Sequence, residues 1–258
     1  MKSDAPVTAV RDLKLKKGAT KSHAFECDDG RTYCVKFKDG TRTVINEHVG
    51  YGLAGLLGLP VPESSFVVVP QELIDASEDL RMRGIAAGVH HGSIWLQGCV
   101  EFRMNATNNQ PLVNGDRLPG LVALDNLVLN WDRNNPGNNL LRTTATGELE
   151  YMAVDFDEIL AGPRWTTETM HLVETTSHLM SLPPVLALSV KGLGSFSPWL
   201  EEIEAISEDT VGPILSEVPA SWEIGQREKD VISEFILTRK ALVRGILLAN
   251  RNRFSNWR

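Results

Sequence analysis

The stretch Leu124–Leu141 reads LDNLVLNWDRNNPGNNLL and joins two apolar segments through a polar turn. The turn contains the helix breakers Pro136 and Gly137 and ends at Leu140 and Leu141. Asp and Asn commonly hydrogen-bond their own backbone in loops, so a surface turn is the simplest interpretation. Their oxygens are also the hard ligands that Mg²⁺ prefers, so a metal site is the alternative. The other motifs of the chain decide between these interpretations.

Composition narrows the class of protein. The chain has 258 residues, 42% of them hydrophobic, which is enough for one large domain or two lobes. Its formal net charge of -7 argues against binding to duplex DNA, so a nucleic-acid partner is not expected. The three cysteines lack zinc-ligand spacing. Without a signal-peptide pattern or a run of about 18 apolar residues, we expect a cytoplasmic protein that does not enter membranes.

The first hundred residues have mainly β character. Asp28–Gly30 is a tight-turn signal between two alternating runs and predicts a hairpin. One helix is expected from Thr43 to Leu57, ended by Gly58 and Pro60. Residues 71–92 are polar and contain glycines, and this pattern predicts at most a short helix. Strands are expected near residues 7–13, 23–27, 31–38, 64–70 and 93–102.

The second part of the sequence is mainly helical. Residues 118–131 predict a helix that leads into the polar turn, and Tyr151–Phe156 predicts a strand. Helices follow Pro163, most clearly over residues 228–251. A β-rich part followed by a helical part indicates an α+β fold. We expect one domain over residues 1–258, with an N-lobe of about 1–100, a C-lobe of about 101–258 and a ligand cleft between them.

Two charged residues of the N-lobe suggest a phosphate site. Lys36 lies within an apolar strand, where an ammonium group needs a partner. Glu47 lies on the helix that follows this strand. In phosphoryl transfer from ATP, a strand lysine neutralises phosphates and a helix glutamate orients the lysine. The alternatives without a binding role are a lysine that extends to solvent and a glutamate on an exposed helix face.

The polar residues of the C-lobe complete this pattern. Asp132 lies in the turn, and Asp155 directly follows an apolar strand. One aspartate near the acceptor hydroxyl can act as a base, while an Asn and a second Asp can hold Mg²⁺. Asn138 and Asn139 are the candidates for that Asn.

Four motifs together resemble the HipA-like kinases, a branch of the protein-kinase-like fold. These motifs are CVKF, NEHVGYGLAGLLGLPVP, LVLNWDRNNPGNNLL and AVDFDEIL, within residues 7–160. The N-x-D-R…N-L-L pattern is also similar to the catalytic loop of phosphoinositide kinases. The resemblance implies a bilobal kinase that uses ATP and Mg²⁺ and phosphorylates a hydroxyl, with Ser or Thr of a protein as the suggested acceptor.

The resemblance also implies roles for individual residues. Lys36 and Glu47 would bind the nucleotide, Asp132 would be catalytic, and Asn139 and Asp155 would bind metal. Kinase catalytic loops usually place the Asn five residues after the Asp, where this chain has Gly137. Asn139 is preferred because the N-L-L tail matches, and Asn138 stays open.

The sequence offers two candidates for the second metal ligand and one segment for the phosphate loop. Asp157 is an alternative to Asp155, because AVDFDE contains both. The segment KKGATKSHAF, residues 16–25, would cover the phosphates with a single glycine, Gly18. Two other functions remain possible. One is a nucleotide-binding regulator with a kinase fold, and the other is a phosphohydrolase with Asp132, Asp155 and Asp157 as a metal-binding cluster.

Two further expectations concern large side chains. Trp131, next to Asp132, is expected to anchor the loop in the core. His90 and His91 lack a visible third metal ligand and are expected in a turn before the next strand.

Overall fold

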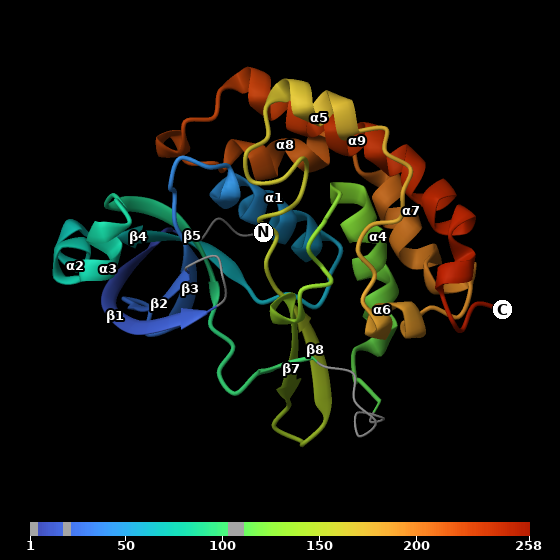
Figure 1. Ribbon diagram of the computed structural model, residues 1–258, viewed down its shortest axis with the longest axis horizontal. Helices are drawn as coiled ribbons and strands as arrows, with labels where there is room; N and C mark the ends of the chain where they lie inside the picture. Colours follow the sequence, from blue (N-terminus) through green and yellow to red (C-terminus); the bar gives the residue numbers. More distant parts are fainter. Residues whose placement is uncertain (1–4, 18–21, 103–110) are drawn as a thin grey trace.

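The structure, a computed structural model, describes residues 5–17, 22–102 and 111–258. A β-rich N-terminal part and a helical C-terminal part lie beside each other (Figure 1). This confirms the predicted α+β arrangement. The expected phosphate-loop residues 18–21 lie outside the described residues.

The N-terminal part is a closed barrel with the strand order β1-β2-β3-β5-β4. Strands β2 and β3 pair as an antiparallel hairpin through the predicted turn, where Gly30 has a φ of +78° that favours glycine. The barrel encloses its own small core, which includes Phe25, Val35 and Val67. The strands are β1 (Val7–Lys17), β2 (Ser22–Cys27), β3 (Thr32–Lys36), β4 (Ser64–Val69) and β5 (Gly88–Ile94).

Helix α1 (Thr43–Leu56) agrees with the predicted helix and links the two parts of the molecule. Its buried apolar residues belong to the large core of the helical part, not to the barrel core. Gly50 makes this close packing possible, because a Cβ at this position would lie 2.4 Å from the Phe156 ring. The helix that carries Glu47 is therefore packed against the C-terminal part.

Three predictions in the barrel region were wrong. Two short helices, α2 (Gln71–Ala76) and α3 (Glu78–Met82), form where at most one was expected. The strand expected at 93–102 is the end of β5, a loop that turns at Gly98 (φ +74°) and a short strand β6 (Val100–Glu101). His90 and His91 lie inside β5 and not in a turn, because β5 pairs with strands on both sides.

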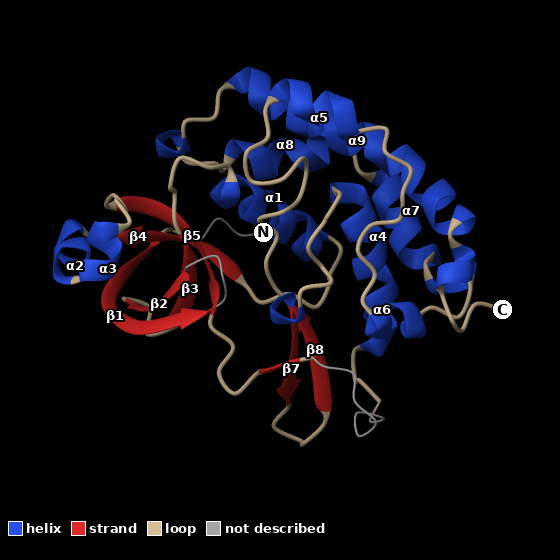
Figure 2. Ribbon diagram, viewed as in Figure 1, coloured by secondary structure: helices blue, strands red, loops and turns tan. Residues whose placement is uncertain are grey.

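The polar turn lies between a buried helix and a small sheet (Figure 2). Helix α4 (Leu118–Val128) ends at Leu129, whose φ of +53° stops the helix. A 3-10 turn, Pro136–Asn138, then leads into β7 (Asn139–Thr143), which pairs with β6 and with β8 (Leu149–Ala153). The turn therefore has buried elements on both sides.

Helices α6, α7 and α9 pack against α4, and α5 and α8 pack against α9 (Figure 1). Helix α9 is the long helix predicted near residues 228–251, and its apolar positions join the large core. Within the described residues, none of the helices is both long and apolar enough to cross a membrane. These helices are α5 (Thr167–Val173), α6 (Pro184–Ser189), α7 (Ser197–Ala205), α8 (Glu208–Ser216) and α9 (Gln226–Ala249), with short 3-10 turns at Gly115–Arg117, Leu193–Ser195, Ala220–Trp222 and Arg251–Arg253.

Residues 214–228, which we call the C-terminal brace, contact α1 and the barrel. Trp222 Nε1 donates a hydrogen bond to the Val89 carbonyl of β5 at 2.8 Å. His48 Nε2 on α1 donates to the Ile214 carbonyl at 2.7 Å. Because these contacts join segments far apart in sequence, the brace fixes α1 and the barrel relative to the helical part.

Candidate active site

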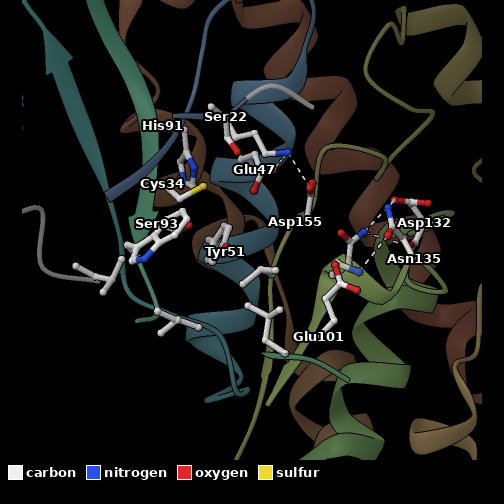
Figure 3. Close-up of a pocket in the computed structure, with 18 residues that line it drawn as sticks. Ser22, Cys34, Glu47, Tyr51, His91, Ser93, Glu101, Asp132, Asn135 and Asp155 are labelled. Carbon is white, nitrogen blue, oxygen red and sulfur yellow. Dashed lines mark hydrogen bonds and ion pairs between the residues drawn. The ribbon is translucent and has the colours of Figure 1, made fainter. Parts of the chain in front are cut away.

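A cleft of about 280 Å³ lies between the barrel and the helical part. The barrel and α1 contribute Lys36, Glu47 and the residues beside them to one wall. Asp132, Asn138 and Asp155 come from the polar turn and the end of β8. Figure 3 shows Glu47 and Asp155 close together, with Asp132 farther along the same cleft. The structure thus brings most of the predicted site residues into one cavity.

Lys36 lies among three carboxylates. Its Nζ is 2.8 Å from Asp155 Oδ2, 3.1 Å from Asp157 Oδ2 and 3.4 Å from Glu47 Oε1. The lysine is 8% exposed, so these contacts are shielded from water. The Lys36–Glu47 pair forms as the sequence predicted, but the shorter contacts are with the two aspartates. The name "acid cluster" is used below for Lys36, Glu47, Asp155 and Asp157.

The acid cluster has unequal pKa values. Burial opposes charge on Lys36, but the three carboxylates outweigh burial and raise its pKa well above the usual value. Burial raises the pKa of Glu47 well above its usual value, against the attraction of Lys36. Burial together with the neighbouring Asp155 raises the pKa of Asp157 to about 7. For Asp155, Lys36 and hydrogen bonds outweigh burial and lower the pKa to about 2.

The three carboxylates could hold a divalent cation. One oxygen from each of Glu47, Asp155 and Asp157 lies within 4.8 Å of the others. Glu47 Oε1 is buried and has no hydrogen-bond partner among the described residues. Hard carboxylate oxygens in this number suit Mg²⁺, which needs few protein ligands. The donor set therefore fits the predicted metal, and both Asp155 and Asp157 belong to it.

Asp132 and Asn138 are joined by hydrogen bonds. Asn138 Nδ2 donates to Asp132 Oδ2 at 2.9 Å and to the Asp132 carbonyl at 3.1 Å. Asn135 Nδ2 also donates to Asp132 Oδ2, at 3.1 Å. Among the described residues, these donors leave Asp132 Oδ1 for another group. Because the amide nitrogen of Asn138 is used, its amide oxygen is the atom that could bind a metal.

Asn139 does not line the cleft, whereas Asn138 does. Asn139 Nδ2 donates to the carbonyls of Arg133 at 2.8 Å and Asn135 at 2.7 Å. Asn139 Oδ1 accepts a hydrogen bond from the Tyr151 hydroxyl. Both ends of the Asn139 amide are therefore used to hold the turn. This geometry favours Asn138 for the metal role that the sequence assigned to Asn139.

The anchor of the polar turn is Arg133, not Trp131. The expectation for Trp131 was wrong, because this side chain is 46% exposed. Arg133 is 0% exposed and its Nε lies 3.0 Å from Asp125 Oδ2 on α4. Sequence reasoning did not identify this pair. The available signal was Asp125 itself, a carboxylate inside an apolar helix that needs a buried partner.

Sequence reasoning also missed two aromatic rings on the barrel side of the cleft. Tyr51 and His91 line the cavity, and their ring centroids are 5.3 Å apart. Burial lowers the pKa of His91 well below its usual value, and the nearby His48 and Lys36 lower it further. His91 is therefore neutral at ordinary pH. The signal for Tyr51 was its position one helical turn after Glu47.

Comparisons with known proteins find similar solved structures. The crystal structure of the Helicobacter pylori proinflammatory kinase CtkA matches with a TM-score of 0.60 and 12% identity, covering 97% of this chain and 99% of that chain. A crystal structure of the Golgi casein kinase with Mn/ADP bound matches with a TM-score of 0.47 and 9% identity, covering 95% of this chain and 73% of that chain.

The first of these two likenesses shows that the chain has a kinase fold. No curated protein sequence matches the chain. The family model described as HipA-like kinase matches residues 8–184, which include every candidate site residue. The chain belongs to the HipA-like kinase family.

Proposed function

We propose that this chain is an ATP- and Mg²⁺-dependent kinase that transfers the γ-phosphoryl group to a hydroxyl, with Ser or Thr of a protein as the acceptor class. The observation that carries the proposal is the convergence of Lys36, Glu47, Asp132, Asn138 and Asp155 on one cleft. The acceptor class rests only on the family resemblance.

On this proposal, the barrel side of the cleft binds the nucleotide. Lys36 contacts the phosphates, and Glu47, 3.4 Å away, holds the ammonium group in place. The Lys36 ammonium group now lies against Asp155 and Asp157. A divalent cation on these carboxylates would neutralise them and leave Lys36 to the nucleotide.

The opposite side would hold the metal and the acceptor. Asp155, Asp157 and the amide oxygen of Asn138 would hold Mg²⁺, which when bound neutralises charge on the phosphates. Asp132 Oδ1 would accept the hydrogen bond of the acceptor hydroxyl and then its proton. Hydrogen bonds from Asn135 and Asn138 fix the carboxylate of Asp132 for this task. Catalysis then depends on positioning and charge neutralisation.

A binding experiment with a matched control tests the proposal. Calorimetry with an ATP analogue and Mg²⁺ should show binding to the wild type and a loss of at least about tenfold in Lys36→Met. Lys38→Met is the control, because Lys38 lies two residues further on and pairs with the exposed Glu223 at 2.7 Å. Equal affinity of wild type and Lys36→Met would remove Lys36 from the site.

A turnover experiment separates the other functions. Labelled ATP should yield a phosphorylated acceptor or slow release of phosphate in wild type, and neither in Asp132→Asn. Nucleotide binding without any turnover in wild type would indicate a regulator. Phosphate-ester hydrolysis that is unchanged in Lys36→Met would indicate a phosphohydrolase.

A further inference from the structure

Arg133 contacts three separate segments that carry the proposed chemistry. Its Nε and Nη2 lie 3.0 and 3.3 Å from the two carboxylate oxygens of Asp125 on α4. Its Nη1 donates to the Asn138 carbonyl at 3.0 Å and to the Val154 carbonyl at 2.8 Å. The guanidinium carbon lies 5.1 Å from the centre of the Phe156 ring. One buried side chain thus joins α4, the polar turn and the end of β8.

These contacts are next to three residues of the proposed metal and acceptor side, Asp132, Asn138 and Asp155. Arg133 directly follows Asp132, and one of the carbonyls that it binds belongs to Asn138 itself. The other belongs to Val154, the residue before Asp155. A movement of the guanidinium group would therefore displace Asp132, Asn138 and Asp155 relative to one another.

The backbone at Asp155 needs such support. Asp155 has a φ of +67°, a conformation that costs energy for a residue with a side chain. The residue before it, Val154, is held through both of its backbone groups, since its N–H donates to the Asn138 carbonyl at 3.1 Å and its carbonyl accepts from Arg133. Arg133 and Asn138 together keep this strained residue in place.

We propose that Arg133 is a positioning residue that sets the geometry between Asp132, Asn138 and Asp155. This inference rests on the proposed kinase function and deepens it. Arginine suits the task because its planar group offers donors in several directions at once, which a lysine ammonium group on a flexible stem cannot reproduce. Lys36 lies on β3 on the barrel side, whereas the hydrogen bonds of Arg133 go to α4, the polar turn and the end of β8.

The test must separate positioning from stability. Arg133→Gln alone leaves Asp125 buried without its cation, so this variant can fail to fold. The double variant Asp125→Asn/Arg133→Gln removes both charges and keeps hydrogen-bonding groups. We expect it to fold, to bind the ATP analogue without Mg²⁺ as wild type does, to require about 10- to 100-fold more Mg²⁺ and to lose about 100-fold in turnover.

Arg239 provides a matched control. It is also 0% exposed, and it donates to backbone carbonyls, including that of Asn126 at 2.6 Å, but it contacts none of the proposed site residues. Arg239→Gln should lower thermal stability and leave the Mg²⁺ requirement of the folded fraction unchanged. A folded double variant with wild-type turnover and Mg²⁺ requirement would overturn the proposal.

A readout without activity keeps the inference separate from the proposed function. Amide hydrogen exchange should be faster at Val154 in the double variant than in wild type, and unchanged at Val154 in Arg239→Gln. If wild type neither binds nor turns over ATP, the kinase proposal fails, and exchange at Val154 still decides whether Arg133 holds this segment. Unchanged exchange at Val154 in the double variant would show that Arg133 does not position it.

Discussion

Two of the buried charged clusters among the described residues differ in their balance of charge. In the pair Asp125–Arg133, one carboxylate meets one guanidinium group, and the side chains are 1% and 0% exposed. In the acid cluster, one ammonium group meets three carboxylates, and the cluster borders the cleft. The first cluster is sealed and neutral, whereas the second has an excess of negative charge beside a cavity.

This difference indicates which cluster holds the fold and which binds a ligand. Burial of a charge is costly unless it is paired, so the balanced pair is complete as it stands. Burial raises the pKa values of Glu47 and Asp157, and the neighbouring carboxylates raise them further, so bound protons reduce the excess negative charge of the acid cluster. A divalent cation on Asp155 and Asp157 would offset the same excess of negative charge. The predictions below test this contrast.

The largest effect is expected from Asp155→Asn. The change removes a carboxylate that lines the cleft and belongs to the proposed metal site. Mg²⁺-dependent affinity for an ATP analogue should fall by about 10- to 100-fold, and turnover should be lost. Calorimetry with and without Mg²⁺ measures the first quantity, and labelled ATP measures the second. Full Mg²⁺-dependent binding by this variant would remove Asp155 from the metal site.

Asp132→Asn should affect chemistry without affecting binding. Asp132 belongs to neither cluster, so the metal site stays intact in this variant. Affinity for the ATP analogue with Mg²⁺ should match wild type, while turnover falls by about 10²–10⁴-fold, as for loss of a general base. Turnover at the wild-type rate would mean that the polar turn has no catalytic role.

Substitutions of the two adjacent asparagines should have different effects, one on the Mg²⁺ requirement and the other on stability. Asn138→Ala should raise the Mg²⁺ concentration for half-maximal activity by about tenfold, because Asn138 lines the cleft. Asn139→Ala should instead lower the free energy of unfolding by about 1–3 kcal/mol, because it leaves buried polar groups without partners. A Mg²⁺ titration and a urea titration of both variants compare them. The reverse ranking would restore Asn139 as the metal ligand.

The smallest effect is a pH dependence of stability. Asp157 has a folded-state pKa of about 7 against an ordinary value of 3.8, so the folded state binds the proton more tightly than the unfolded state. This contribution to stability is complete below pH 3.8 and is lost as pH rises through about 7. Without metal, the melting temperature should therefore fall by a few degrees between pH 5.5 and pH 8. Each kcal/mol lost from the free energy of unfolding lowers the melting temperature by roughly 2–4 °C.

Magnesium should counteract this loss. Added Mg²⁺ should raise the melting temperature more at pH 8, where it meets carboxylates without protons, than at pH 5.5. Thermal unfolding of wild type and Asp157→Asn across this range provides the comparison. If both proteins show the same pH slope, Asp157 does not hold the proton.

Local patterns were enough to predict much of the fold and many of the site residues. The β-rich part followed by a helical part, the β2–β3 hairpin and α1 followed from turn residues and apolar spacing, whereas the kinase fold followed from the resemblance of four motifs to the HipA-like kinases. Lys36, Glu47, Asp132 and Asp155 were named because each charged residue stood beside an apolar element, and all four line the cleft. Their roles in binding and catalysis stay predictions.

The errors have a common physical cause in non-local contacts. The bounds of β5 depend on pairing with β3 and β4, which are distant in sequence. The burial of Arg133 in place of Trp131 depends on Asp125, which lies on the preceding helix. The choice between Asn138 and Asn139 depends on the 3-10 turn before β7, because it decides which side chain faces the cleft.

The C-terminal brace has a consequence for where the functional unit ends. The match to the family model stops at residue 184, but α1 is held by Ile214, and Arg42, at its start, pairs with Glu228. A protein cut at residue 184 would retain every proposed catalytic side chain and lose the contacts that hold the helix carrying Glu47. Sequence similarity thus covers every proposed site residue, and we expect the smallest portion with the proposed activity to extend at least through residue 228.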